Sequence, residues 1–512
     1  LNPMTYLFKF TVQWALSGRY EPLPENIKQN IDIRDLTSSK VITYFMLETS
    51  LCTLVMLGQI EVGFWVRNGV PISHQAKMYT KYSMREFTYV SDIFNVQLGM
   101  CNSNPSDFLV TYFIRWGLKN WCNGTPIGDY PDEQTTVGIV NEALILLIRL
   151  LTETKSLIIS SSVDSFERTL RAEIVHAICF KHATYQQIVD EIPEHITKHA
   201  AFDSYLIKYT NFHKPQDSDE TGTFTLKEEY ECEINPYYYG LSSNRRYEVE
   251  KEIRERMEKS SHVRFDDTFV PPKKIIDKLQ TTPYPNLFVI TSVDCFGLFL
   301  KNTLDYIKKM KYDVLLPRVV HLVHIAVVNN IHDFTKIFWH EYEIVDTEFY
   351  HYHSIGSLLY SLLAIDDFSV VHGEIKQIFS YLKTNAPHVD IDSYLLEQTE
   401  SYNPDVLWST ATYQHLKDTE MNKKKEKARL RKEKILKKLV HQQKKFMENN
   451  QAPPSEDDLS IDSTFSSQRS LQSEVPGYLG WKFPDDFCIF CKMDKEDATF
   501  VYFSYEEVGI CD

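Results

Sequence analysis

Three cysteines near residue 512 are the side chains whose type and spacing point most directly to chemistry. Cys488 and Cys491 form a CxxC pair, and Cys511 follows after nineteen intervening residues. Thiolates at such spacing serve either as zinc ligands or as a redox pair. A redox pair needs a thioredoxin-like βαβ context, which the neighbouring sequence does not show. We therefore favour a structural zinc module with Cys488, Cys491 and Cys511 as ligands.

The spacing C-x2-C-x19-C fits the first half of a RING finger. A structural zinc site is tetrahedral and takes four ligands, so three thiolates cannot complete it. We therefore expect the zinc module, over residues 484–512, to be truncated in this chain.

A strongly basic segment precedes these cysteines. Residues 423–445 hold twelve Lys or Arg and two Glu, so the segment carries a net charge of +10. No Pro or Gly interrupts residues 418–450, and Lys, Arg, Glu and Leu all favour helices. The pattern predicts one long helix over residues 418–450, roughly 45 Å in length for about 30 residues.

This predicted helix also has an apolar stripe. Its members recur seven or four residues apart along one face, namely Met421, Ala428, Ile435, Leu439 and Phe446. A solvated helix needs no such stripe, and a nucleic-acid tail rarely has one. We therefore favour a helix that lies along an acidic protein partner, where the stripe supplies affinity and the charge steers association. A solvated face, a nuclear-import signal and nucleic-acid binding are the alternatives.

Other residues with chemical potential give weaker signals. Six histidines gather in the second half of the chain: His321, His324, His332, His340, His351 and His353. His340-Glu341 lacks the second histidine of an HExxH motif at Ile344, so we expect surface or core histidines. No Gly-rich phosphate loop or GxSxG element occurs. The first six cysteines are scattered, and we expect buried apolar residues at Cys52, Cys101, Cys122, Cys179, Cys232 and Cys295.

The composition of the chain indicates what kind of fold carries these residues. The 512 residues are 43% hydrophobic and 24% charged, which is ordinary for a protein with sizeable cores. There are only 17 glycines, which favours helices over turn-rich β structure. The net charge of −15 separates into the basic segment and a body with 43 basic and 68 acidic residues, near −25. An acidic body argues against a general nucleic-acid binder.

The number of cysteines and the length of the apolar runs indicate the cellular compartment of the protein. Nine cysteines, odd in number and scattered, suit a reducing compartment, and no signal-peptide pattern opens the sequence. The longest apolar stretches, residues 143–151 and 287–300, are shorter than the ~20 residues that a membrane-spanning helix needs. We expect a cytoplasmic protein that can also be nuclear, with no membrane partner. Because residue 1 is Leu, we also expect a piece of a longer protein.

The remaining sequence predicts a mainly α fold. Residues 1–160 and 241–417 read as a helical scaffold, in which residues 140–151 are apolar nearly all round and should form a central buried helix. Between the two parts, helices over residues 166–180, 184–192 and 201–209 precede strands over residues 223–226 and 230–234. This order predicts a winged-helix module over residues 165–235. Residues 451–480, rich in Ser, Pro and acids, should form a disordered tether.

The predicted winged-helix module does not resemble a DNA-binding domain in its charges. Such modules often bind DNA through their third helix. Here that helix carries Asp203 as well as Lys208, and the predicted wing carries Glu228, Glu229, Glu231 and Glu233. Because phosphates repel carboxylates, we favour a structural or protein-docking role.

Four stretches of the chain resemble the N-recognin ubiquitin ligases, large proteins with a UBR box and a RING finger, and most closely their fungal members. The stretches are Gly63-Phe-Trp-Val-Arg-Asn-Gly69 with Met84-Arg85-Glu86, Ala172-Glu-Ile-Val-His-Ala-Ile-Cys179 with Ile192-Pro-Glu194, Lys427-Ala-Arg-Leu-Arg-Lys-Glu-Lys-Ile435, and Cys488-Ile-Phe-Cys491. Their order and spacing match the family over most of the chain.

This resemblance implies a RING-type ubiquitin-protein ligase of the N-degron (N-end rule) pathway, which transfers ubiquitin from a bound conjugating enzyme to substrate lysines for proteasomal degradation. Such a ligase forms no covalent intermediate, so it implies no catalytic residue, and its zinc is structural. The basic helix would dock the ubiquitin-conjugating enzyme charged with ubiquitin. The implied contacts are Met421, Arg431, Lys434, Ile435, Lys438, Leu439 and Phe446, together with Phe490 of the RING.

The sequence departs from the full family pattern in two places. No Cys/His-rich cluster precedes Cys488, so a UBR box is not visible, and the second half of the RING is absent. We expect this stretch alone neither to bind N-degrons nor to ligate, with substrates held by regions outside it. Two alternatives stay open: an adaptor-dependent paralogue of the family without N-degron recognition, and a non-enzymatic helical scaffold whose basic helix binds nucleic acid.

Overall fold

The computed structural model describes residues 7–12, 40–65, 69–81, 83–124, 130–157, 162–215, 221–259, 272, 274–280, 282–311, 314–345, 350–399 and 402–408. The predicted basic helix, tether and RING module all lie outside the described residues. Their boundaries therefore stay predictions.

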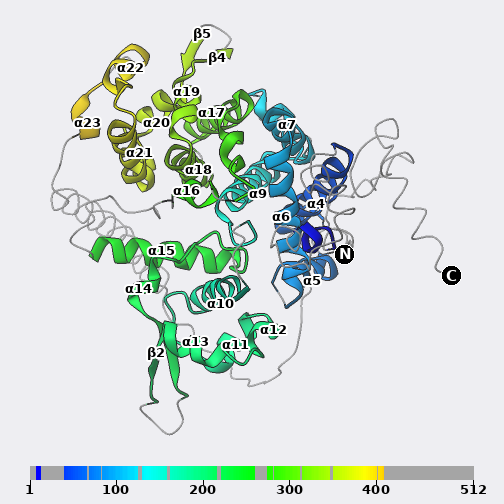
Figure 1. Ribbon diagram of the computed structural model, residues 1–512. Coiled ribbons are helices and arrows are strands. Elements are labelled where there is room, and N and C mark those ends of the chain that lie inside the picture. Colours follow the sequence, from blue (N-terminus) through cyan, green and yellow to red (C-terminus); the bar gives the residue numbers. More distant parts are fainter. Residues whose placement is uncertain are drawn as a thin grey trace, which may run out of the picture. The chain divides into compact units, whose positions relative to one another are not determined.

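Most described residues are helical, so the predicted mainly α fold is confirmed (Figure 1). The first group of helices starts with a helical stretch at residues 7–12. It continues with α4 (Lys40–Glu61), α5 (Gly69–Lys81), η2 (Ser83–Glu86), α6 (Tyr89–Asn102), α7 (Pro105–Arg115), α8 (Lys119–Cys122) and α9 (Glu133–Thr152).

Helix α9 lies at the centre of the helical core. Its N-cap residue, Asp132, accepts a hydrogen bond from the backbone N–H of Thr135 at 2.7 Å, which satisfies one of the free donors of the first turn. All of residues 143–148 are buried, and the helix packs against α4, α6 and α18. Helix α9 is long and apolar enough to cross a membrane, yet two thirds of its most apolar window is buried among these neighbours. The predicted central helix over residues 140–151 is confirmed, and it starts earlier, at Glu133.

The second group of elements forms the winged-helix module, drawn in green in Figure 1. It comprises α10 (Ser162–Ile178), β1 (Ala183–Thr184), α11 (Tyr185–Glu191), α12 (Glu194–Thr197), α13 (Phe202–Tyr209), β2 (Thr210–His213), β3 (Thr223–Leu226) and α14 (Glu228–Glu231). The antiparallel sheet has the order β1-β3-β2, with Ala183 opposite Phe224 and Thr210 opposite Leu226.

One strand of the predicted wing is wrong. Strand β3 lies where the sequence predicted it, but its hairpin partner is β2, directly after α13, and not residues 230–234. Because β3 pairs with β1 along one edge and with β2 along the other, no edge is left for a further strand. Residues 228–231 instead form α14, where Tyr230 packs edge-on against Tyr209 at 4.9 Å between ring centroids. The acidic residues assigned to the wing therefore lie in and beside α14.

The third group returns to helices. It comprises α15 (Ser243–Lys259), α16 (Ile276–Leu279), η3 (Leu287–Ser292), α17 (Asp294–Met310), α18 (Leu316–Asn329), α19 (Ile331–Trp339), β4 (Tyr342–Val345), β5 (Tyr350–His353), α20 (Ile355–Leu362), η4 (Asp366–Val371), α21 (His372–Asn385), α22 (Ile391–Gln398) and α23 (Pro404–Trp408). Helix α18 packs on α9 and α21, and α17 packs on α7, α8 and α20. Helices before and after the winged-helix module therefore share one apolar core.

Candidate functional site

The residues predicted to bind zinc or the conjugating enzyme all lie in residues 409–512, outside the described residues. The predictions for Cys488, Cys491, Cys511 and Phe490, and for the contacts on the basic helix, are therefore not tested by the structure. The described residues contain a different polar site, at which the winged-helix module meets the first group of helices.

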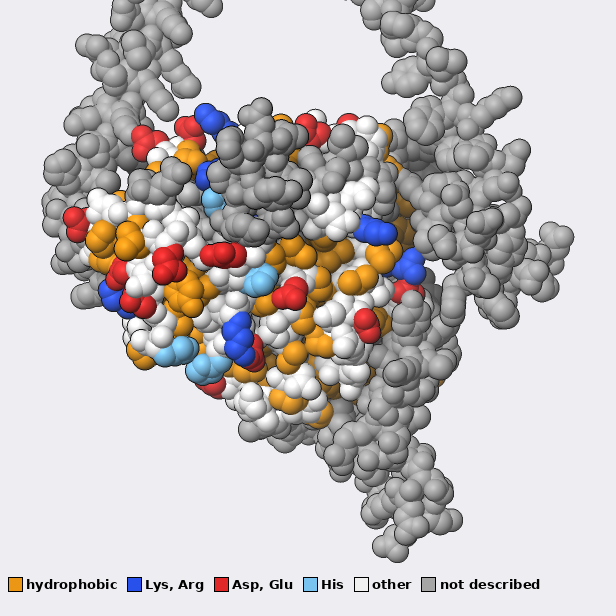
Figure 2. Space-filling model, turned by 90° about the horizontal axis from the view of Figure 1, so that it is seen from above, with side chains coloured by type: hydrophobic (Ala, Val, Ile, Leu, Met, Phe, Trp, Pro, Cys, Tyr) orange, Lys and Arg blue, Asp and Glu red, His pale blue; other side chains and the backbone are white. Residues whose placement is uncertain are grey.

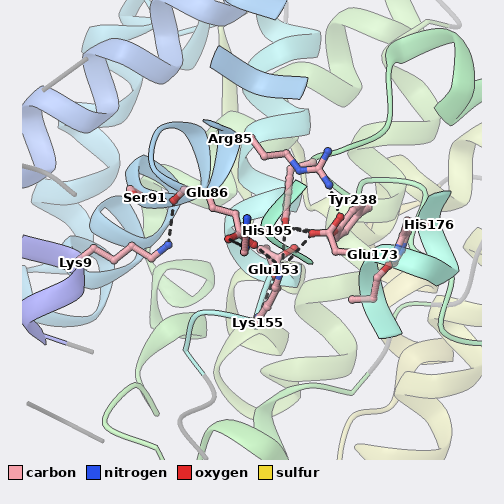
Figure 3. Close-up of polar contacts among 12 residues, drawn as sticks. Lys9, Arg85, Glu86, Ser91, Glu153, Lys155, Glu173, His176, His195 and Tyr238 are labelled. Carbon is pink, nitrogen blue, oxygen red and sulfur yellow. Dashed lines mark hydrogen bonds and ion pairs between the residues drawn. The ribbon is translucent and has the colours of Figure 1, made fainter. Parts of the chain in front are cut away.

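Glu173, on α10, is the centre of this site. Its side chain is 1% exposed and is surrounded by Arg85, Lys155, Tyr238 and Tyr239, and we call these five residues the ionic junction (Figure 3). Tyr238 and Tyr239 donate hydrogen bonds to Oε1 at 2.7 and 3.0 Å. Four residues from three separate stretches of the chain thus converge on one buried carboxylate.

Arg85 reaches the junction from η2. Its Nη2 pairs with Oε2 of Glu173, and its Nη1 donates to the backbone carbonyl of Glu191 at 3.3 Å, at the end of α11. Its guanidinium also lies 5.6 Å from the ring centroid of Tyr239. The stretches around Arg85 and Glu173 were separate motifs in the sequence, and the structure shows that they are the two halves of one contact.

Lys155 reaches the junction from the end of α9. The side chain of Gln97 donates to the carbonyls of Leu150 and Glu153 at 2.8 and 2.6 Å, which fixes the last turn of α9 and the segment that follows. Nζ of Lys155 then lies 3.1 Å from Oε1 of Glu173 and 3.5 Å from Oε1 of Glu86. The central helix of the scaffold is thereby tied to the winged-helix module.

Further polar contacts surround Glu86, next to Arg85. Nε2 of His195, from α12, lies 3.0 Å from Oε2 of Glu86. Lys9 Nζ and Ser91 Oγ donate to the backbone carbonyl of Glu86 at 3.4 and 2.8 Å (Figure 3). The residue 7–12 helix and the start of α6 therefore also help to position η2.

The electrostatics of the junction favour an ionised Glu173. Burial by itself would raise the pKa of this carboxyl, but the charges of Lys155 and Arg85 and the hydrogen bond from Tyr238 outweigh it and lower the pKa from 4.5 to about 2. Burial, together with the charge of Glu173, raises the pKa of Tyr238. The tyrosines therefore stay protonated and act as hydrogen-bond donors.

Three consecutive tyrosines, Tyr237–Tyr239, form a strap between the winged-helix module and the helices on both sides. Tyr238 stacks on His176 of α10 with a centroid distance of 3.9 Å. Tyr237 faces the other way: its ring stacks on His321 of α18 at 5.3 Å, and its carbonyl accepts from Nε of Arg149 at 3.2 Å. One short segment thus connects α10, α9 and α18.

Of the histidines predicted to be surface or core residues, the two on α18 are core residues. His321 and His324 are buried, and the Nδ1 atoms lie 3.1 and 3.2 Å from the same carboxylate oxygen of Glu374. Burial raises the pKa of Glu374, but hydrogen bonds from the two histidines reverse this and lower it. Burial lowers the pKa of His324. Because an ionised carboxylate only accepts, both rings donate from Nδ1.

Among the described residues, no three His, Cys, Asp or Glu side chains are grouped so that they could hold a metal ion. The prediction of six buried cysteines is confirmed for Cys179 and in part for three others, which are half-buried and pack against the apolar core, namely Cys101, Cys122 and Cys295. It is wrong for Cys52 and Cys232, which are exposed. Cys52 and Cys232 lie on the outward faces of α4 and the segment after α14, positions that the apolar pattern alone did not distinguish from inward ones.

The outer surface of the winged-helix module is not arranged for phosphates. On α13, Asp203 accepts a hydrogen bond from Tyr185 at 3.0 Å, and Lys208 pairs with Glu167 at 2.6 Å. Both contacts on α13 favour the structural or protein-docking role over DNA binding. Figure 2 shows another face, seen from above the view of Figure 1, and there Lys and Arg side chains are few and lie among acidic and apolar ones.

Sequence reasoning missed the ionic junction, although signals for it were present. Glu173 follows Leu170 by three residues and precedes Ile174, so it lies on the buried face of α10. A carboxylate in such a position must be paired. The run Tyr237-Tyr238-Tyr239 was the second signal, but nothing in the sequence linked it to Glu173.

Comparisons with known proteins add the following. Residues 2–146 match the family described as "UBR1/2/3-like ARM repeat domain", and residues 169–268 match "E3 ubiquitin-protein ligase UBR1-like, winged-helix domain". The whole chain is 55% identical to "E3 ubiquitin-protein ligase UBR2" of Saccharomyces cerevisiae and covers 27% of that protein. It is 26% identical to "E3 ubiquitin-protein ligase ubr1" of Schizosaccharomyces pombe, over 86% of this chain and 22% of that protein. The chain therefore spans about a quarter of the length of these relatives.

We predict that Glu173→Gln destabilises the fold by about 3–5 kcal/mol, because it leaves Arg85 and Lys155 buried without a counter-charge. The measurement is denaturant unfolding of the 512-residue chain. Glu194→Gln is the matched control in the same module, since its partner Lys198 and Glu194 itself are both exposed, and it should leave the free energy of unfolding nearly unchanged. Equal losses for the two variants would contradict a structural role for the junction.

The same carboxylate predicts a pH dependence. Its pKa in the folded protein, about 2, is below the ordinary 4.5, so the unfolded chain takes up this proton first. The stability that Glu173 contributes should be complete above about pH 4.5 and should be lost as the pH falls toward 2. We expect the difference in unfolding free energy between the natural chain and Glu173→Gln to shrink over this range. A difference that stays constant below pH 4.5 would count against an ionised Glu173.

Proposed function

The chain belongs to the UBR family of E3 ubiquitin-protein ligases, and we propose that it supplies the scaffold and the conjugating-enzyme docking segment of a RING-type ligase of the N-degron pathway. The observation that carries this proposal is the 55% identity, over the whole chain, to a protein named as an E3 ubiquitin-protein ligase. The ARM-repeat and winged-helix matches, in the same order along the chain, support it. This chain spans about a quarter of the length of these relatives. The activity, substrates and partners of a whole ligase are therefore proposals for this chain.

We assign docking of the ubiquitin-conjugating enzyme to the basic segment. Residues 423–445 carry a net charge of +10 on a chain whose other residues sum to −25. Such a charge contrast raises the rate of encounter with an acidic partner surface and disfavours contact with the wrong face. Arg431, Lys434 and Lys438 would supply the charge, and Ile435 and Leu439 would be buried at the contact.

Catalysis in this proposal is positioning. A RING ligase holds the charged conjugating enzyme and the substrate lysine close together, which turns a reaction between separate molecules into one within a complex. The ionic junction and the tyrosine strap hold the winged-helix module rigidly on the helical scaffold.

Zinc in this proposal is a structural part of the RING. Cys488, Cys491 and Cys511 offer thiolates, the donors that Zn²⁺ prefers in structural sites. Phe490, between the first two, would then be held at the surface of the module as an apolar contact to the conjugating enzyme. We place the protein in the cytoplasm, with a nuclear pool.

A second candidate function within the same family is an adaptor-dependent ligase without N-degron recognition. The chain is 55% identical to UBR2 of Saccharomyces cerevisiae but 25% identical to UBR1 of the same yeast, so it groups with one of two distinct paralogues. Paired reporters that differ only in their N-terminal residue, Arg or Met, separate the candidates in cells that express the full ligase. Faster loss of the Arg reporter supports the N-degron function, and equal, ligase-independent rates support the adaptor-dependent one.

We predict that replacing Lys434, Lys437 and Lys438 with Glu weakens binding of a ubiquitin-conjugating enzyme about tenfold or more, mainly through slower association. The reason is that three charges change sign in the segment that steers the encounter. Surface plasmon resonance with the 512-residue chain and a panel of conjugating enzymes measures both rates. The matched control reverses three exposed lysines elsewhere, Lys119, Lys214 and Lys336, and should change association much less. Equal effects of the two triple variants would contradict specific docking.

The apolar stripe makes a separate prediction. Ile435→Asp or Leu439→Asp should accelerate dissociation and weaken binding more than any single Lys→Ala change in the segment, because a carboxylate would be buried at the interface without a partner. The same measurement reports the dissociation rates. If Asp at these two positions weakens binding no more than a single lysine substitution, the stripe has no part in the interface.

A further inference from the structure

A cavity beside the start of α9 takes no part in the ionic junction. Its volume is about 570 Å³, and it is lined by residues of α8, of the first turn of α9 and of the last turns of α17. The size falls within the ~300–1,000 Å³ that is typical of ligand sites. Nothing in the family assignment gives this cavity a role.

The floor of the cavity is aromatic. The rings of Trp121 and Tyr306 lie 4.7 Å apart between centroids and are tilted by 53°, and Tyr130 completes the lining. Nε1 of Trp121 donates to Thr303 Oγ1 at 3.0 Å, and the Tyr130 hydroxyl donates to the Trp116 carbonyl at 2.7 Å. These bonds engage the polar ends of two rings in the protein interior. The rings therefore present fixed apolar surface to the cavity.

The rim of the cavity is acidic. It contains three carboxylates, Asp132, Glu133 and Asp305, and one ammonium, Lys309, which lies 3.1 Å from Asp305. Backbone and side-chain hydrogen bonds from Thr135 lower the pKa of Asp132, so this residue keeps its charge in mildly acidic solution. Glu133 accepts a hydrogen bond from the Tyr306 hydroxyl, which joins the rim to the floor. The four charged groups sum to −2.

We propose that this cavity binds an Arg or Lys side chain in a peptide segment of a partner protein. Such a side chain has an apolar stem that can lie on the aromatic floor and a cation that can reach the carboxylates of the rim. The exposed thioether of Met310, at one wall, adapts to the shape of the stem. The net negative charge excludes acidic peptides, and the volume leaves room for one neighbouring residue. The proposal concerns binding alone and does not depend on ligase activity.

The probe is a set of fluorescein-labelled peptides, acetyl-Gly-Ser-Leu-X-Leu-Ser-Gly-amide with the dye on an added C-terminal Lys, where X is Arg, Lys, Gln or Glu. Blocked N-termini exclude recognition of a terminal amine. Fluorescence anisotropy with the full 512-residue chain measures binding. We expect the Arg and Lys peptides to bind about tenfold tighter than the Gln peptide, and the Glu peptide to bind least.

The main variant combines Asp132→Asn with Glu133→Gln. It removes two charges from the rim but keeps a good N-cap for α9 and an acceptor for Tyr306, so the fold should be retained. Binding of the Arg peptide should fall about tenfold or more. Glu397→Gln, at an exposed position on α22, is the matched control and should leave binding unchanged.

A second variant tests the cavity without loss of a carboxylate. Met310→Lys places a resident cation at the wall, on an exposed position at the end of α17, and should compete with the peptide and weaken its binding. Equal binding of the Arg and Gln peptides would overturn the proposal. So would full binding by both variants, since a peptide that ignores the rim charges would bind elsewhere.

Discussion

A buried carboxylate, Glu173, constrains how the described part of this chain can be assembled. An ionised group in an apolar interior is costly unless charges and donors surround it. Here the compensating groups come from η2, from the end of α9 and from the segment after the winged-helix module. Any packing of the module that moved α10 away from these elements would leave Glu173 without a counter-charge on α10. It would also leave Arg85 and Lys155 without their carboxylate on the other helices. The contact therefore penalises alternative arrangements more strongly than it adds stability to the right one.

The other polar contacts extend this constraint. Gln97 fixes the end of α9, which places Lys155, and His176 stacks on Tyr238, which places its hydroxyl. Tyr237 continues toward His321, which in turn lies against Glu374 on α21. Hydrogen-bonded and stacked groups thus run from the first helices through the winged-helix module to the helices that follow it. Because each group contacts the next, the network favours one arrangement of parts that apolar packing alone would allow to slide.

This rigidity suits a ligase scaffold. In the proposed function the chain performs no bond chemistry of its own, and its contribution is to position bound partners. The charge distribution would also help to position partners, because an acidic body and one basic segment attract partners of opposite charge. The aromatic cavity beside α9, with its acidic rim, would add a surface for basic side chains on the described body itself.

Local sequence determined the elements. The helical class, the buried central helix, the three main helices of the winged-helix module and strand β3 all follow from apolar periodicity and chain breaks, which act over a few residues. The basic segment and the cysteine spacing likewise are properties of the sequence alone. The structure decided what depends on partners far apart in the chain. Strand β3 pairs with β1 along one edge and with residues 210–213 along the other, so residues 230–234 have no edge of β3 to pair with. Arg85 and Glu173, 88 residues apart, pair because η2 and α10 pack together. Periodicity marks a face as buried, but it does not say which other face will cover it, and that is why the junction could be found only in three dimensions.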